Sequence, residues 1–353
     1  MTSRHRLLKA LNHEEADRVP ITDAFWPTTE ARWHKEGLPA DQSAARYFGF
    51  ELSGVGFEDT LFGREETLEE TEGYRLFRTG DGNTRKEWKD ATATPQCLDF
   101  LVRGPDDWER LKGRLSNAQQ RIDWQQAKAS AARAHDEGLF FCFSTEVGYD
   151  RCQRLVGTET LLAAMALEPD WVSGMFSSSV DLAIEAAEAM QAQGLRFDGA
   201  FLNDDMGYRN SSLFSPAMYR RLLFPQHQRI FGYFHDRGAK VLLHSCGCVK
   251  QLIPDLLEAG LDCLQPLEVK AGMDLVELKR QYAGRLALMG GIDVRKMAAE
   301  DPAGIEHEIA TKIPVAMAGG GYIYHSDHSV PDDVSFAQYC RTMELVRHYG
   351  RFR

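Results

Sequence analysis

The sequence lacks the features that mark a membrane protein or a disulfide-stabilised secreted domain. No stretch of its 353 residues approaches the roughly 18 consecutive apolar residues of a membrane-spanning helix. Residues 1–20 are charged throughout and contain no apolar core of a secretory signal. The seven cysteines are odd in number and lie mostly singly in apolar runs, which is not the pattern of a disulfide framework. These absences predict a soluble protein of the reducing cytoplasm, without membrane contact.

Excess positive charge and low-complexity sequence are missing as well. The 41 Lys and Arg residues are outnumbered by 52 Asp and Glu residues, and the net charge of −11 argues against nucleic-acid binding. The glycine runs 290–291 and 319–321 lack the spacing of a phosphate-binding or dinucleotide-binding loop, so we expect tight turns there. No linker divides the chain, and residues 1–353 are expected to form one domain. A homodimer is the default expectation for such a protein.

Short apolar runs alternate with helix-like segments along most of the chain. Eight runs are candidate strands: 19–25, 51–57, 139–147, 199–205, 240–246, 262–269, 285–293 and 321–327. They are almost continuously apolar, as parallel strands covered by helices are. The pattern predicts an α/β fold, a (β/α)8 TIM barrel preceded by an N-terminal helix.

Residues 58–120 interrupt this alternation. The sequence TGDGN at 79–83 is typical of a turn between two antiparallel strands. We therefore expect a β-hairpin insertion after an early strand, over one mouth of the barrel.

Polar side chains are concentrated where the predicted strands end, which is where barrels of this kind place their reactive groups. They are Asp23, Glu146, Asp204, Asp205, His244, Cys246, Glu268, Asp293, His325, Asp327 and His328. Buried carboxylates and imidazoles cost free energy unless they are paired, so the concentration indicates a site for a small-molecule substrate. Asp23, Glu146 and the nearby Tyr149 are candidates for cofactor contacts.

The sequence His244-Ser245-Cys246 is the most informative of these. Residues two apart at a strand end face the same cavity, and an imidazole with a thiolate suits Zn²⁺. A third ligand must come from another loop, and the candidates are Glu268, His325, Asp327 and His328. The alternative is that His244 is hydrogen-bonded in the core and Cys246 fills space.

The remaining acids and histidines are candidates for proton transfer or substrate binding. Adjacent strand residues point in opposite directions, so one of Asp204 and Asp205 is expected to enter the mouth while the other caps a segment or meets a helix. The inward carboxylate would bind a cationic group or act as a general acid. Asp327 and His328 are further catalytic candidates, or members of a hydrogen-bonded cluster that stabilises their loop.

Three segments resemble the uroporphyrinogen decarboxylase superfamily, in particular its bacterial paralogues. Residues 6–21 resemble the opening helix and first strand of that family, residues 199–225 its central aspartate segment, and residues 244–293 its C-terminal half in order and spacing. The resemblance runs nearly end to end and implies the barrel fold.

The resemblance implies two alternative functions. Decarboxylases of the family use no cofactor and bind the many carboxylates of their substrate with arginines that follow the first strand. In this chain the corresponding segment, residues 24–37, contains one arginine, Arg32. Methyltransferases of the family move a methyl group from a corrinoid protein to a thiol, with zinc held by an HxC motif and a distant cysteine. His244 and Cys246 match that motif, but Asp327 stands where the distant cysteine is expected.

The resulting hypothesis is a zinc-dependent methyltransferase. Its methyl group would come from a methylated small molecule or from a corrinoid carried by a partner protein. Two alternatives remain: a metal-free carboxy-lyase, with Asp204 or Asp205 stabilising a cation and Asp327 and His328 donating protons, and a non-catalytic binder of a tetrapyrrole or corrinoid.

Overall fold

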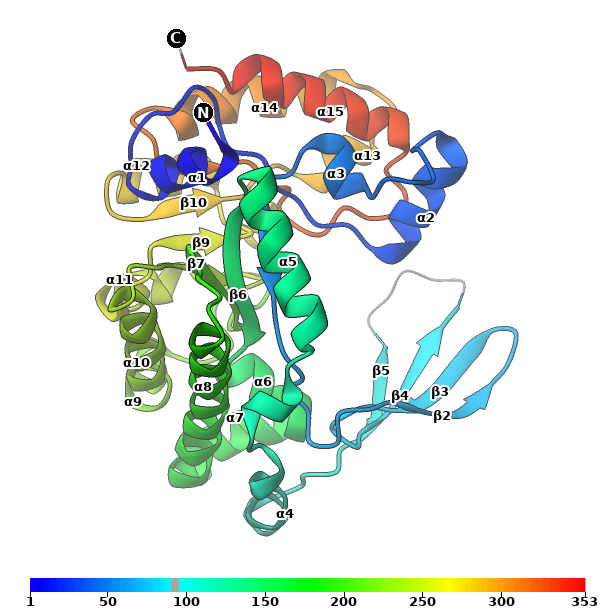
Figure 1. The fold of residues 1–353 in the computed structure, drawn as a ribbon, viewed down its shortest axis with the longest axis vertical. Helices are drawn as coiled ribbons and strands as arrows, with labels where there is room; N and C mark the ends of the chain where they lie inside the picture. The colour runs from blue at the N-terminus through cyan, green and yellow to red at the C-terminus, as the bar shows by residue number, and fades with distance from the viewer. Residues whose placement is uncertain (90–94, 353) are drawn as a thin grey trace.

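Seven parallel strands form the centre of the molecule in the computed structural model, which describes residues 1–89 and 95–352. Their order in the sheet is β1, β6, β7, β8, β9, β10, β11, so that sequence neighbours lie side by side. The strands are β1 (Leu52–Val55), β6 (Phe140–Glu146), β7 (Gly199–Asn203), β8 (Lys240–His244), β9 (Cys263–Gln265), β10 (Ala287–Met289) and β11 (Tyr322–Ile323). Figure 1 shows the sheet curled, with helices on its outer side.

Seven of the eight predicted runs contain these strands, and the eighth, 19–25, lies between the two ends of the sheet. It forms isolated parallel bridges to the chain after β11, at Ile21–Tyr324 and Phe25–Val330. On its other side the backbone carbonyl of Ile21 accepts a hydrogen bond from the amide of Glu51, at 3.0 Å. The result is an α/β fold that resembles a TIM barrel.

Fifteen α-helices and four short 3₁₀ helices occur in the described part of the chain. The α-helices are α1 (Ser3–Leu11), α2 (Pro27–Glu36), α3 (Ala44–Phe48), α4 (Pro105–Leu111), α5 (Trp124–Glu137), α6 (Gly148–Val156), α7 (Thr158–Leu167), α8 (Pro169–Ala192), α9 (Pro216–Leu222), α10 (Phe224–His235), α11 (Ile253–Ala259), α12 (Leu275–Tyr282), α13 (Val294–Ala298), α14 (Ala303–Met317) and α15 (Phe336–Tyr349). The 3₁₀ helices are η1 (Lys112–Arg114), η2 (Ala118–Arg121), η3 (Lys250–Leu252) and η4 (Val269–Ala271). None of the helices in residues 1–89 and 95–352 has the length and apolar character needed to cross a bilayer.

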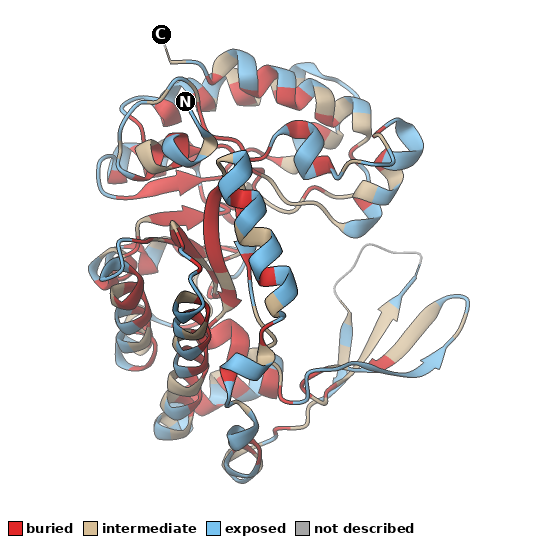
Figure 2. Ribbon diagram, in the orientation of Figure 1, coloured by how far each residue is buried: buried red, intermediate tan, exposed pale blue. Residues whose placement is uncertain are grey.

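Local sequence explains where several helices begin and which side they bury. Ser335 and Gln338 form a reciprocal capping box at the start of α15, and Asp123 caps α5. In α8 the buried residues include Val172, Phe176 and Val180, which recur every four residues and so lie on one face. Buried residues run along the parallel strands, while the outer helix surfaces are exposed (Figure 2).

The insertion forms a second, antiparallel sheet, in the order β2, β3, β4, β5. Its strands are β2 (Glu66–Glu70), β3 (Tyr74–Arg78), β4 (Thr84–Trp88) and β5 (Gln96–Asp99). The turn at 79–83 joins β3 to β4, where the sequence predicts the hairpin, whereas β2 and β5 were not predicted. The sheet projects from the body beside the barrel (Figure 1).

The tip of this hairpin is held against α6 by a buried ion pair. Arg151 is 3% exposed and donates two hydrogen bonds to the carboxylate of Asp81, at 2.7 and 3.1 Å. The side-chain amide of Asn83 donates a hydrogen bond to the backbone carbonyl of Arg154.

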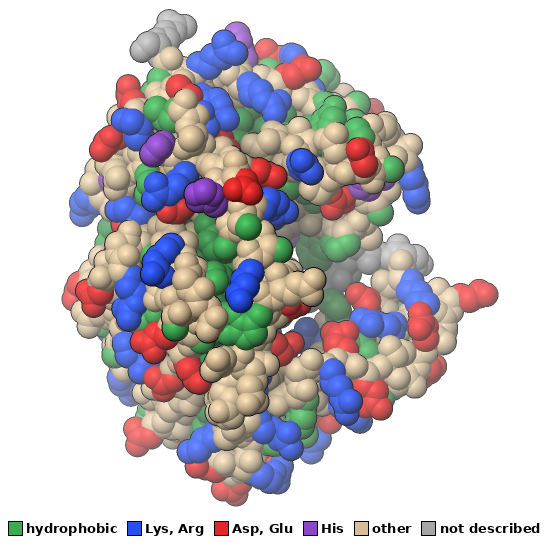
Figure 3. Space-filling view, viewed as in Figure 1, with side chains coloured by type: hydrophobic (Ala, Val, Ile, Leu, Met, Phe, Trp, Pro, Cys, Tyr) green, Lys and Arg blue, Asp and Glu red, His purple; other side chains and the backbone are tan. Residues whose placement is uncertain are grey.

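Charged side chains of both signs are mixed over the face shown in Figure 3, without a large area of one sign.

Candidate metal centre

Four polar residues lie in one row across the C-terminal ends of adjacent strands. Glu146 of β6 is paired with Asn203 of β7, which is paired with His244 of β8, which is paired with Gln265 of β9. Parallel strands end at the same edge of a sheet, so the row marks the mouth of the barrel.

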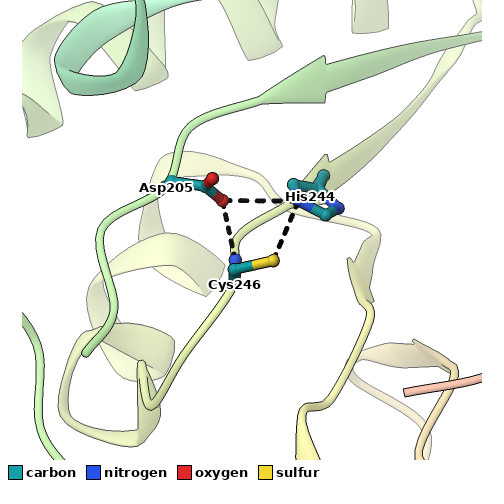
Figure 4. A group of neighbouring side chains, drawn as sticks. All are labelled: Asp205, His244 and Cys246. Atoms are coloured by element: carbon teal, nitrogen blue, oxygen red, sulfur yellow. Dashed lines mark hydrogen bonds and ion pairs between the residues drawn. The ribbon is translucent and has the colours of Figure 1, made fainter. Parts of the chain in front are cut away.

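Asp205, His244 and Cys246 converge at this mouth (Figure 4). Nε2 of His244 lies 3.3 Å from Oδ1 of Asp205 and 3.3 Å from Sγ of Cys246. The backbone amide of Cys246 donates to the same Asp205 oxygen, at 2.8 Å. The His244 side chain remains 23% exposed, so the group is accessible from the adjoining cavity.

Two loops are pressed together to place these side chains. A Cβ atom added to Gly207 would lie 2.3 Å from the carbonyl oxygen of Cys246, so only glycine allows this approach. Gly247 has φ +75°, and a Cβ atom added there would lie 2.5 Å from the carbonyl carbon of Gly207. The amide of Cys248 donates to the carbonyl of Tyr208 at 2.7 Å, which links the loops a second time.

The electrostatics of the three residues favour a positive charge between them. Burial disfavours the imidazolium form of His244, but hydrogen bonds with Asp205 and Cys246 outweigh it and raise the pKa of His244 well above its ordinary value. Burial also opposes ionisation of Asp205, yet the neighbouring His244 ring leaves the pKa of this carboxyl below its ordinary value. Burial raises the pKa of the Cys246 thiol. The potential at Nε2 of His244 therefore suits a cation.

The donor set fits a zinc ion. Ligands on a tetrahedral zinc at ordinary bond lengths are about 3.3–3.8 Å apart. The two distances of 3.3 Å from His244 Nε2 meet this condition, and the three ligand atoms lie within 4.8 Å of one another. One nitrogen, one sulfur and one oxygen are donors that zinc accepts, and three protein ligands with one open position are typical of a catalytic site.

A cavity of about 820 Å³ opens beside the three residues and is lined by both His244 and Cys246. Its lining also includes the apolar side chains of Cys142, Phe201 and Met289. Among its described lining residues Arg154 is the one arginine or lysine, and Arg154 is paired with Glu146 at 2.6 Å. This volume is of the size that small-molecule ligands occupy.

The structure places the other expected metal ligands away from this cluster. Glu268 accepts a hydrogen bond from the amide of Gly247 at 2.7 Å and pairs with Lys270 at 3.1 Å. His325 lines the cavity, but its ring nitrogens face Gln265 and the carbonyl of Ser326. The third residue beside His244 and Cys246 is thus Asp205, and neither Glu268 nor His325 joins the group.

The expected catalytic residues also separate. Asp204 is fully buried and its side chain turns away from the mouth. Its carboxylate lies 2.9 Å from Nε2 of His227 on α10 and accepts a hydrogen bond from the backbone amide of Asp150, at 2.8 Å. Asp327 accepts hydrogen bonds from the amides of Val269 and Val294, at 3.0 Å each, and so joins two loops. Of these residues, Asp205 lies at the cluster.

His328 and the three cofactor candidates occupy different positions. His328 lines the cavity and stacks on Trp26, with 6.4 Å between the ring centroids. Asp23 lines the cavity and accepts a hydrogen bond from the hydroxyl of Tyr339, at 2.7 Å. Tyr149 is fully buried on α6.

Burial among carboxylates raises the pKa of Glu146 to about 8 despite its contact with Arg154. Gln265, Asn203 and Arg154 lie at the site but were not predicted from the sequence. For Gln265 a signal was present, because a glutamine interrupts the apolar run DCLQPL.

Comparison with known proteins agrees with this architecture. The family model for uroporphyrinogen decarboxylase (URO-D) matches residues 152–349, more than half of the chain. A methylated-thiol–coenzyme M methyltransferase of Methanosarcina mazei is 24% identical over 143 residues, which are 40% of this chain and 35% of that protein. A solved methyltransferase structure from Methanosarcina mazei has a TM-score of 0.67 at 18% identity, and the match covers 99% of this chain and 98% of that one. The chain belongs to the uroporphyrinogen decarboxylase family.

Proposed function

We propose that this protein is a methyltransferase that holds zinc on Asp205, His244 and Cys246 and activates a methyl acceptor there. The convergence of three suitable donor atoms beside an open cavity carries the proposal. The resemblance of the chain to a methylated-thiol–coenzyme M methyltransferase supports the choice of reaction, although the alignment spans only about a third of that protein.

When bound, zinc would lower the pKa of an acceptor thiol or similar group and so supply a nucleophile near neutral pH. With zinc bound, Cys246 would be a thiolate and Asp205 a carboxylate, and their two negative charges would balance the ion. Nitrogen and carboxylate oxygen are harder donors than a second thiolate, so this donor set would leave more charge on the metal. The open side of the cluster faces the cavity, where the acceptor binds.

The reaction forms a bond between the acceptor atom and the methyl carbon. The bond from methyl to its donor breaks, and its electron pair stays with the donor. We propose a methylated corrinoid on a partner protein, or a methylated small molecule, as this donor. His328, with Trp26 behind it, contributes to the cavity wall and positions the substrate. Asp204 and Asp327 are assigned to loop anchoring, since both carboxylates accept backbone hydrogen bonds outside the cluster.

We propose that residues 1–353 form one barrel domain with eight parallel strand positions, with residues 58–120 as an insertion over one mouth. The ion pair between Arg151 and Asp81, which holds the hairpin tip against α6, supports this placement.

A carboxy-lyase reaction is the alternative that family membership supports. Decarboxylation of a substrate with many carboxylates needs several cations at the mouth, and the described cavity lining offers one, Arg154, which already pairs with Glu146. This observation favours methyl transfer.

The test begins with metal-depleted protein, reloaded with zinc and assayed with methylcobalamin and a panel of small thiols. We expect one zinc per chain, zinc-dependent methylation, and loss of both in Cys246→Ala. Cys248→Ala is the matched control, because Cys248 lies in the same turn but outside the cluster. Metal-independent release of carbon dioxide by Cys246→Ala would instead select the carboxy-lyase. Tight corrinoid binding without turnover would select a binding protein.

A further inference from the structure

The side of His244 that faces away from Cys246 leads into a buried chain of hydrogen bonds. Nδ1 of His244 lies 2.5 Å from Oε1 of Gln265, and Nε2 of Gln265 lies 3.1 Å from Nε2 of His325. Nδ1 of His325 lies 2.7 Å from the carbonyl oxygen of Ser326. Gln265 and His325 are 3% and 5% exposed, so little water competes for these contacts.

The carbonyl of Ser326 determines which group donates and which accepts in every hydrogen bond of this series. A carbonyl oxygen only accepts hydrogen bonds, so the proton of the His325 ring is on Nδ1. Burial lowers the pKa of His325, which keeps the ring neutral and leaves a lone pair on its Nε2. That lone pair must receive a hydrogen bond, and the amide nitrogen of Gln265 is the group facing it.

The orientation of Gln265 then decides which nitrogen of His244 carries a proton. With its NH₂ group facing His325, the side-chain amide of Gln265 turns its oxygen toward His244. An amide oxygen only accepts, so Nδ1 of His244 must donate. The lone pair of His244 available for a metal is therefore the one on Nε2, which faces Asp205 and Cys246.

We propose that Gln265 and His325 are positioning residues that keep the His244 proton on Nδ1 and turn Nε2 toward the metal position. This role depends on the proposed zinc site, whereas the hydrogen bonds described above do not depend on it. Ligand histidines commonly have such a partner on the second nitrogen, and loss of the partner weakens metal binding about 10–100-fold.

Asp23 holds the His325 end of this series of hydrogen bonds in place. Asp23 accepts hydrogen bonds from the hydroxyl of Tyr339, at 2.7 Å, and from the amide of Ser326, at 3.1 Å. Its Oδ1 lies 3.3 Å from Nδ1 of His325. The loop after β11 and the segment 20–25 therefore both hold the His325 ring in place, and Asp23 acts on the site through His325.

Zinc affinity, measured by competition with a chromophoric chelator, tests the first half of the proposal. Gln265→Leu removes the acceptor and should weaken zinc binding about 10–100-fold. Gln265→Glu keeps an oxygen facing Nδ1 of His244 and should bind zinc within about threefold of the unmodified protein, or more tightly. Gln281→Leu, the same change at an exposed position of α12, is the control and should leave affinity unchanged. Equal zinc affinity in folded Gln265→Leu, or equal weakening in Gln265→Glu, would overturn the proposal.

Nitrogen NMR of metal-free protein with ¹⁵N-labelled histidine tests the second half without zinc. We expect His325 to be neutral with its proton on Nδ1. His244 should carry a proton on Nδ1 at every pH, and the second proton, on Nε2, is the one lost when its raised pKa is passed. His325→Gln assigns the His325 signals. A neutral His325 with its proton on Nε2 would reverse the direction of these hydrogen bonds. It would refute the proposed role of Gln265 and His325, even in a protein that binds zinc. The expected ring pattern in a protein that binds no zinc would refute the zinc proposal alone.

Discussion

Replacing Asp205 by Asn separates the charge of this residue from its shape. Oδ1 of Asp205 accepts from the Cys246 amide at 2.8 Å and lies 3.3 Å from Nε2 of His244. An asparagine oxygen still accepts from the amide, so the loop keeps its anchor. The change converts a charge-assisted hydrogen bond into a neutral one, and the free energy of unfolding should fall by only about 1 kcal/mol.

Zinc binding should fall much further, because one of the two negative ligands becomes neutral. We expect at least a hundredfold loss of zinc affinity, which corresponds to about 2.7 kcal/mol. The assay is chelator competition on the purified variant, with urea denaturation to measure stability alongside.

Glu268→Gln is the matched comparison for this variant. Glu268 accepts a hydrogen bond from the adjacent Gly247 amide but lies outside the three-residue group, so its variant should keep zinc affinity within about threefold. Unchanged affinity in Asp205→Asn together with a large loss in Glu268→Gln would refute the assignment of the third ligand.

Three further predictions concern the surroundings of the site. Gly207→Ala should separate the two loops, since its Cβ would lie 2.3 Å from the Cys246 carbonyl oxygen, and should weaken zinc binding about tenfold in the chelator assay. Arg151→Met leaves the Asp81 carboxylate buried without its partner and should lower the free energy of unfolding by about 3–5 kcal/mol, whereas adding Asp81→Asn should restore part of the loss in urea denaturation. The pKa of Glu146 is raised from 4.5 to about 8 in the folded protein, so folding takes up a proton between pH 4.5 and pH 8. The stability that protonated Glu146 contributes is complete below pH 4.5 and is lost as the pH rises toward 8. The slope should be at most about 1.4 kcal/mol per pH unit and absent in Glu146→Gln; equal slopes in both proteins would contradict it.

Much of the barrel could be predicted from sequence because its strands are buried on both faces. The run KVLLH of β8 is apolar except at its ends, and it lies where the pattern predicts a strand. The segment 19–25 was also located, although it pairs through isolated bridges. The insertion was harder to predict, because β2 (Glu66–Glu70) is exposed at every position and has no apolar alternation.

The site could be located but not completed from sequence. Strand-end position identified His244 and Cys246, and the alternation of strand residues required one of Asp204 and Asp205 to enter the mouth. Which of the two enters depends on a long-range contact, the hydrogen bond of Asp204 with His227 on α10, and no local pattern encodes it. Gln265 depends in the same way on a histidine sixty residues later in the chain.

X-ray absorption at the zinc edge of the reloaded protein reports directly which atoms bind the metal. We expect one zinc per chain, with one sulfur at about 2.3 Å and the remaining ligands nitrogen or oxygen at about 2.0–2.2 Å. The sulfur shell should disappear in Cys246→Ala. Absence of stoichiometric zinc, or a sulfur shell that persists without Cys246, would contradict the proposed zinc site.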